Sequence, residues 1–155
     1  MINYQKGQTL IETLSAIAIL SIVIVAIATS VTSALSNTEF NQNQTLATKY
    51  AQQGSEIVNQ IRDTSYVSFL NYTATNYCLA ANQTALTTAP QAGCPVNISG
   101  VFIRSVQITQ NGCVANVAKV TVSVAFTDGK CTSGTYCHVQ SDTSCLSTTN
   151  PVQSP

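Results

Sequence analysis

Charged residues are scarce in this sequence, and their scarcity excludes one class of function. Six of the 155 residues are Lys or Arg and six are Asp or Glu, so the formal net charge is zero. Proteins that bind the phosphate backbone of nucleic acids carry a basic excess, so we expect no specific nucleic-acid binding here. Between Thr13 and Thr38 no side chain is charged. This apolar stretch predicts an anchor, and the more polar remainder predicts one small domain.

Motifs of enzymes and cofactor sites are also missing. The sequence contains no H-E-x-x-H motif and no glycine-rich phosphate loop, and His138 is its only histidine. We therefore predict no enzymatic activity, no catalytic residue and no cofactor. Asp128 with Asp142 is a conceivable calcium pair. However, two acids near turns, without further oxygen ligands around them, are better explained as solvated side chains.

The cysteines indicate the compartment of the C-terminal part. All six lie after the apolar segment, at Cys78, Cys94, Cys113, Cys131, Cys137 and Cys145. An even number of cysteines confined to one part of a chain predicts disulfides formed in an oxidising compartment. Zinc is the alternative use of clustered cysteines, but there is no Cys-x-x-Cys pair and the only histidine directly follows Cys137. We therefore predict no metal site.

The N-terminal stretch KGQTLIETLSAIAILSIVIVAIATSV allows three interpretations. As a simple anchor, Leu14–Leu35 is long enough to cross a bilayer as a helix, but this leaves the acid Glu12 unexplained. As a secretory signal, it would be cleaved after Ala28, at a small-x-small site, and would release a secreted, disulfide-bonded binding domain. The sequence nevertheless stays compatible with a helix well beyond Ala28, which a disposable signal peptide does not require.

The third interpretation depends on the motif Gly7-Gln8-Thr9-Leu10-Ile11-Glu12. This motif resembles the cleavage and methylation site of type IV prepilins and of the pseudopilins of type II secretion. The resemblance implies that Gly7 ends a short basic leader, that Gln8 becomes the N-methylated mature N-terminus, and that Glu12 is the family's glutamate at the fifth mature position. Two features depart from the family pattern: Gln8 replaces the usual Phe, and no helix-breaking Pro or Gly occurs between Gln8 and Lys49.

The resemblance also implies a function, partners and a location. It predicts a structural subunit of a type IV pilus or, alternatively, a pseudopilin of a secretion or DNA-uptake system. A prepilin peptidase would process the chain, and an assembly platform with its ATPase would build it into a homo- or hetero-polymer. Glu12 would then set the register between subunits by pairing with a neighbour's N-terminal amine. Lys6 is the only basic residue before the apolar stretch, so the positive-inside rule places that end in the cytoplasm until the subunit joins a cell-surface filament.

The apolar helix is expected to continue as an amphipathic one. Apolar residues recur at helical spacing along one face, at Leu46, Tyr50, Gly54, Ile57, Val58 and Ile61. A helix from Gln8 to about Asp63 would be about 80 Å long. We divide the chain into a leader (1–7), a transmembrane or filament-core helix (8–36), its amphipathic continuation (37–64) and a β-rich head (65–155).

The head is expected to contain a small antiparallel sheet. Residues 118–126 alternate between apolar and polar, as a half-buried strand does. Val101–Thr109 and Thr135–Gln140 are further strand candidates, with turns at Asn111-Gly112 and Asp128-Gly129. Tyr77–Ala81 is a candidate edge strand.

Antiparallel pairing of these strands also suggests how the cysteines combine. It would bring Cys131 near Cys137 across a hairpin and Cys113 toward Cys145 at its far end, which leaves Cys78 with Cys94. The predicted fold class is α+β: a long N-terminal helical spine carrying a small antiparallel head that is stapled by disulfides.

Overall fold

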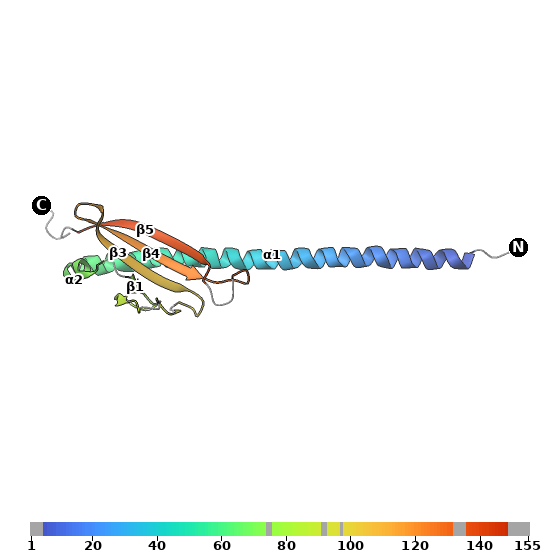
Figure 1. The fold of residues 1–155 in the computed structure, drawn as a ribbon, viewed down its shortest axis with the longest axis horizontal. Coiled ribbons are helices and arrows are strands. Elements are labelled where there is room, and N and C mark those ends of the chain that lie inside the picture. Colours follow the sequence, from blue (N-terminus) through green and yellow to red (C-terminus); the bar gives the residue numbers. More distant parts are fainter. Residues whose placement is uncertain (1–4, 74–75, 91–92, 97, 132–135, 149–155) are drawn as a thin grey trace. The chain divides into compact units, whose positions relative to one another are not determined.

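The structure, a computed structural model, describes residues 5–73, 76–90, 93–96, 98–131 and 136–148. The chain divides into two compact units, Met1–Phe40 and Asn41–Pro155. The fold class is α+β, as predicted. A helix, α1 (Gln5–Thr64), runs through the first unit and into the second, and a sheet follows it in the sequence (Figure 1).

In the first unit, α1 is regular because nothing in its sequence breaks it. It contains no proline, and several of its serines and threonines satisfy their hydroxyl groups within the helix. Thr29 Oγ1 donates to the carbonyl of Ala26 at 3.0 Å, and Thr32 Oγ1 donates to that of Ala28 at 2.9 Å. Such bonds remove the need for water around these polar groups. This helix is long and apolar enough to cross a membrane by length and composition.

The second unit contains a five-stranded antiparallel sheet with the order β2-β1-β3-β4-β5. The strands are β1 (Asn76–Cys78), β2 (Thr87–Thr88), β3 (Ile103–Val114), β4 (Val117–Phe126) and β5 (His138–Ser147). The long strands β3, β4 and β5 lie side by side in Figure 1. A short helix, α2 (Tyr66–Asn71), follows α1 and buries Phe69.

The core of this unit forms between α1 and one face of the sheet. Alternate residues of β4 are fully buried, at Ala118, Val120, Val122, Val124 and Phe126. The helix approaches this face closely at Gly54, where an added Cβ atom would lie 2.7 Å from Val122 Cγ1 and 3.1 Å from Arg104 Cδ. A contact below 3.0 Å leaves no room for a side chain, so glycine is needed there for packing.

The helical face that packs on the sheet is rotated relative to the prediction. Leu46, which we expected on that face, is 39% exposed, and Tyr50 and Ile57 are only partly buried. Three predicted positions, Gly54, Val58 and Ile61, are buried as expected, and the small residues Ala47, Ala51 and Ser55 are buried beside them. Size explains the shift, because small residues let the helix backbone approach the sheet, whereas Leu46 would hold it away.

The β3–β4 turn does not lie at Asn111-Gly112, as we expected. Asn111 has a positive φ of 57°, but it lies within β3, where the register shifts between Thr109 and Val114. The hairpin turns at Ala115-Asn116 instead, with a φ of 60° at Asn116. Both asparagines adopt the left-handed conformation that the prediction used as a turn signal, and the first of them lies where the β3–β4 register shifts.

Three further differences concern the ends of the sheet. The strand expected from Thr135 begins at His138 and continues to Ser147, and Thr135 itself lies outside the described residues. β1 was expected at an edge but lies between β2 and β3. Neither β2 nor α2 was predicted, because elements of two and six residues show too little periodicity.

Three disulfides link segments of the second unit. They join Cys78 to Cys94, Cys113 to Cys145 and Cys131 to Cys137, and none of the six cysteines is free. The second of these connects β3 to β5 across β4, and the third closes the connection between β4 and β5. The structure thus brings together the same pairs that antiparallel strand pairing suggested.

Candidate processing and assembly site

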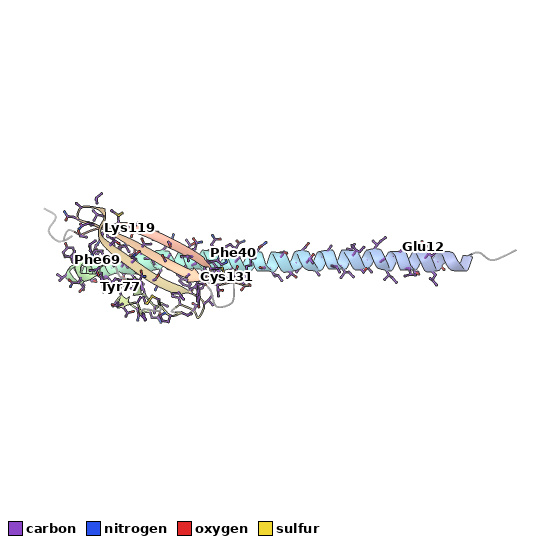
Figure 2. The ribbon with its side chains drawn as sticks, viewed as in Figure 1. Glu12, Phe40, Phe69, Tyr77, Lys119 and Cys131 are labelled. Atoms are coloured by element: carbon purple, nitrogen blue, oxygen red, sulfur yellow. A yellow bond between two sulfur atoms is a disulfide. The ribbon has the colours of Figure 1, made fainter. Side chains whose placement is uncertain are left out.

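Glu12 is the one acidic residue at the start of the apolar stretch, and its side chain is exposed on α1 (Figure 2). Its backbone carbonyl accepts a hydrogen bond from Ser15 Oγ at 2.9 Å. Within the described part of the chain, no lysine, arginine or histidine forms an ion pair with its carboxylate. A carboxylate beside apolar surface is costly to remove from water without a cation, so Glu12 requires one from outside the chain if this surface becomes buried.

The apolar side chains that follow Glu12 have no partners inside the first unit. They are between 47% and 70% exposed, and they include Leu14, Ile17, Ile19, Leu20, Ile22, Val23, Ile24, Val25, Ile27 and Val31. Each exposed side chain of this size forgoes about 1.5 to 3 kcal/mol of burial free energy in water. An apolar surface this long therefore calls for lipid or other apolar helices around it.

Gly7 and Gln8 lie near the start of α1, with Gln8 four positions before Glu12. Residues four apart on a helix share one face, about one turn from each other. A new N-terminus at Gln8 would therefore place its amine at the same end of the helix as Glu12. Side-by-side helices with a small stagger would bring an amine and a carboxylate of different subunits to the same level.

The charged residue that our reading of the sequence missed is Arg104, which is fully buried in the second unit. Its Nε donates to the carbonyl of Leu79 at 2.9 Å, its Nη2 to that of Ala80 at 2.9 Å, and its Nη1 to that of Tyr50 at 3.1 Å. Burial lowers the pKa of Arg104, and an interaction with Tyr50 partly offsets that effect. This residue fastens α1 and the segment after β1 to β3, so its role is structural.

A sequence signal for Arg104 does exist. It occupies an inward position of β3, on the same face of the strand as Val106 and Ile108, which are both fully buried. An arginine at a position that alternation assigns to the core must have its guanidinium group satisfied by nearby acceptors. The alternation of β3 therefore marks Arg104 as buried, although it does not say which carbonyls accept its hydrogen bonds.

The two acids considered for calcium are engaged separately. Asp142 Oδ2 accepts a hydrogen bond from Ser55 Oγ at 2.6 Å, whereas Asp128 Oδ1 lies 3.2 Å from His138 Nε2. His138 and Asp142 are four residues apart on β5, which corresponds to about 13 Å along a strand. These contacts do not gather the two carboxylates around one ion. The expectation that both acids are solvated turn side chains is wrong, because the Asp128 side chain is buried and Asp142 lies within β5.

Burial raises the pKa of Asp128, but the other effects outweigh it and the net shift is downward. Hydrogen bonds from the backbone N–H groups of Lys130 and Cys131 and the contact with His138 stabilise the carboxylate. The Asp128 side chain is only 4% exposed. The structure thus maintains a buried, ionised carboxylate at the start of the β4–β5 connection.

The N-terminal part of the chain matches a known family. Residues 2–28 match the family model of the prokaryotic N-terminal methylation motif. The match contains Gly7, Gln8 and Glu12 together with most of the exposed apolar stretch of α1. Searches of curated proteins and of solved structures found no significant match. The second unit is therefore interpreted from its own residues.

Proposed function

We propose that this chain, which carries the N-terminal methylation motif of type IV pilin-like proteins, is the structural subunit of a type IV pilus or a related filament. A prepilin peptidase cleaves it after Gly7 and methylates the new N-terminus at Gln8. The subunits then polymerise through their N-terminal helices. The observation that carries this proposal is the match over residues 2–28, which joins the processing motif to an apolar helix lacking partners of its own.

The precursor fits a single-pass membrane protein. Its one N-terminal helix with the length and composition of a membrane span follows the processing motif directly. Lys6, the basic residue before that span, favours a cytoplasmic N-terminus, and the three disulfides of the second unit favour export of the head. An assembly platform and its ATPase would then transfer the subunit from the membrane to a filament on the cell surface.

Glu12 has a specific role in this proposal. A charged side chain at the centre of a bilayer costs about 2.5 to 3.5 kcal/mol when it has no partner. The methylated amine of Gln8 on a neighbouring subunit supplies the missing cation when the apolar helices pack together. Because pairing requires the two groups at one level, it selects one stagger between subunits, and Glu12 acts as a register residue.

A pseudopilin of a type II secretion or DNA-uptake system shares this chemistry. Processing, methylation and helix packing would be the same, and the difference lies in the apparatus that extracts the subunit. The remaining alternative is a binding domain secreted after cleavage at Ala28. The extent of α1 favours processing at Gly7, because cleavage there removes only Gln5, Lys6 and Gly7 from the helix, whereas cleavage after Ala28 would divide it in its apolar part.

The mature N-terminus distinguishes these proposals directly. The chain is expressed with a prepilin peptidase, and its N-terminal peptide is sequenced by mass spectrometry. We expect a peptide that begins at Gln8 and carries one additional methyl group on its amine. A peptide that begins at Thr29 would identify a secreted domain, and an intact N-terminus in the presence of active peptidase would rule out processing. Substitution of Gly7→Leu serves as the control, because the peptidase should leave this chain uncut.

A further inference from the structure

The connection between β4 and β5 gathers four side chains of the kinds that bind transition metals. They are Asp128, Cys131, Cys137 and His138, and their ligand atoms all lie within 4.8 Å of one another. The Cys131 sulfur is 3.5 Å from Asp128 Oδ1, and His138 Nε2 is 3.2 Å from the same oxygen. Around a tetrahedral zinc ion, neighbouring ligand atoms are about 3.3 to 3.8 Å apart. Small side-chain rotations would therefore convert this cluster into a complete ligand shell.

A second observation points to a cation at this cluster. The Asp128 side chain is 4% exposed, and its Oδ2 atom accepts no hydrogen bond from any residue that the structure describes. A buried carboxylate oxygen that lacks a donor is costly, and a metal ion would satisfy it. His138 is also held in place, because its ring stacks on Phe126 with a centroid distance of 5.2 Å. Two of the four ligands are thus already fixed in the folded head.

We propose that this cluster is a zinc site in the reduced protein, in which Zn²⁺ replaces the Cys131–Cys137 disulfide as the staple of the β4–β5 connection. The two states exclude each other because both use the same sulfur atoms. In the oxidised chain these atoms are bonded to one another, whereas zinc requires them as thiolates.

The conversion needs a reductant, which a dithiol supplies. The dithiol gives two electrons and two protons to the Cys131–Cys137 bond, which breaks into two thiols, and the dithiol becomes a disulfide. Cys137 is exposed, so a dithiol can reach this bond. Zn²⁺ then displaces both thiol protons to solvent and forms two Zn–S bonds, with neutral His138 and the carboxylate of Asp128 as the other two ligands. This proposal does not depend on the filament role of the chain.

Cobalt titration of the full chain in detergent tests the site. The protein is reduced with a dithiol, desalted without oxygen and titrated with Co²⁺, and zinc affinity is then measured by displacement of the cobalt. We expect one tetrahedral cobalt ion per chain with thiolate-to-cobalt absorption, and full displacement by one equivalent of Zn²⁺. The oxidised protein should not show this absorption. Equal binding by the oxidised protein, or no tetrahedral spectrum after reduction, would overturn the proposal.

Two pairs of variants separate this site from the other cysteines. C131S/C137S should abolish the tetrahedral spectrum, whereas the matched variant C113S/C145S should retain it. D128N and H138Q keep every cysteine and should each weaken zinc binding by at least about tenfold, since even indirect partners of zinc ligands contribute that much. Unchanged affinity in D128N and H138Q, or an intact spectrum in C131S/C137S, would show that zinc binds elsewhere.

Discussion

Ser55 of α1 and Asp142 of β5 are joined by a short hydrogen bond, with 2.6 Å between Ser55 Oγ and Asp142 Oδ2. Ser55 is buried, and β5 is the last strand in the sheet order. The bond therefore fastens the outermost long strand to the helix that covers the core. The bond also directs the carboxylate of Asp142 toward α1. One of the two acids considered for calcium is therefore engaged by a serine hydroxyl group.

Removal of this hydroxyl group should destabilise the second unit. Ser55→Ala leaves a partly buried carboxylate without its donor, at an expected cost of about 1 to 3 kcal/mol. The measurement is the free energy of unfolding of the full chain in detergent, obtained from denaturant titration. Ser68→Ala is the matched control because Ser68 is exposed on α2. Equal stability of the two variants would show that the bond contributes nothing.

A methyl group at position 54 should be harmful although it favours helix formation. Gly54→Ala gains about 0.5 to 1 kcal/mol in helix propensity. It also places a Cβ atom 2.7 Å from the buried Val122 Cγ1, and such overpacking costs about 1 to 3 kcal/mol. We expect a net loss in the free energy of unfolding. In the control Gly129→Ala, the new Cβ meets no atom within 4 Å, so a loss of the same size there would disprove the packing argument.

Substitution of the buried Arg104 should destabilise the head more than substitution of the partly exposed Arg62. Arg104→Met removes hydrogen bonds to the carbonyls of Leu79, Ala80 and Tyr50. Although the variant no longer has to bury a charge, the loss of these three hydrogen bonds from a charged donor should lower the unfolding free energy by at least about 2 kcal/mol. Arg62→Met removes an ion pair with Asp63, in which the two side chains are 22% and 54% exposed, and it should cost no more than about 1 kcal/mol. Thermal unfolding followed by circular dichroism compares the two variants, and similar melting temperatures would contradict the assigned role of Arg104.

The disulfides should differ in their contributions according to the loops they close. The Cys113–Cys145 bond spans a sequence separation of 32, and the Cys131–Cys137 bond spans 6. Loop-closure entropy predicts that their loss destabilises the protein by about 3.7 and about 2.4 kcal/mol respectively. Denaturant unfolding of C113S/C145S and C131S/C137S measures the difference. The reverse order would show that native-state strain outweighs loop entropy in this head.

The register role predicted for Glu12 has a matched control on the same helix. Glu12→Ala should leave cleavage and membrane insertion intact, but the neighbour's amine then lacks a partner, at a cost of about 2.5 to 3.5 kcal/mol. Incorporation into filaments should therefore fall by at least about tenfold, which corresponds to about 1.4 kcal/mol. Glu39→Ala removes an exposed acid beyond the apolar stretch and should assemble normally. Quantification of sheared filaments relative to the membrane pool tests this, and normal incorporation of Glu12→Ala would exclude the pairing.

Strong periodicity made the long elements predictable. The alternation of residues 118–126 gave β4 to within one residue, and the uninterrupted helical pattern after Gln8 gave α1. The close approach at Gly54 was predicted correctly, but one side of the buried face was misjudged because hydrophobicity favoured Leu46 over the small residues Ala47 and Ala51. Hydropathy ranks residues by their affinity for water, and it does not measure the space between two elements.

The candidate sites also differ in how far the sequence alone could predict them. Gly7, Gln8 and Glu12 lie within one continuous motif, so the sequence alone suffices to predict them as a site, and their roles stay predictions. The three carbonyls that accept hydrogen bonds from Arg104, and the cluster around Asp128, lie on segments that only tertiary folding brings together. Asn111 shows what a local sequence pattern leaves open. Its positive φ was predicted correctly, but it lies within β3 at a register shift and not in the hairpin turn.

The position of β5 after all other strands in the sequence has a consequence for folding during synthesis. β4 pairs with β3 on one side and with β5 on the other, from Val117↔Ser147 to Phe126↔His138. Until residues 138–147 have emerged, one edge of β4 lacks its strand partner. Ser55 then lacks its hydrogen-bond acceptor Asp142, and Cys113 lacks its disulfide partner Cys145. The sheet therefore cannot close before residues 138–147 are available, and any factor that protects the emerging chain must hold it open until then.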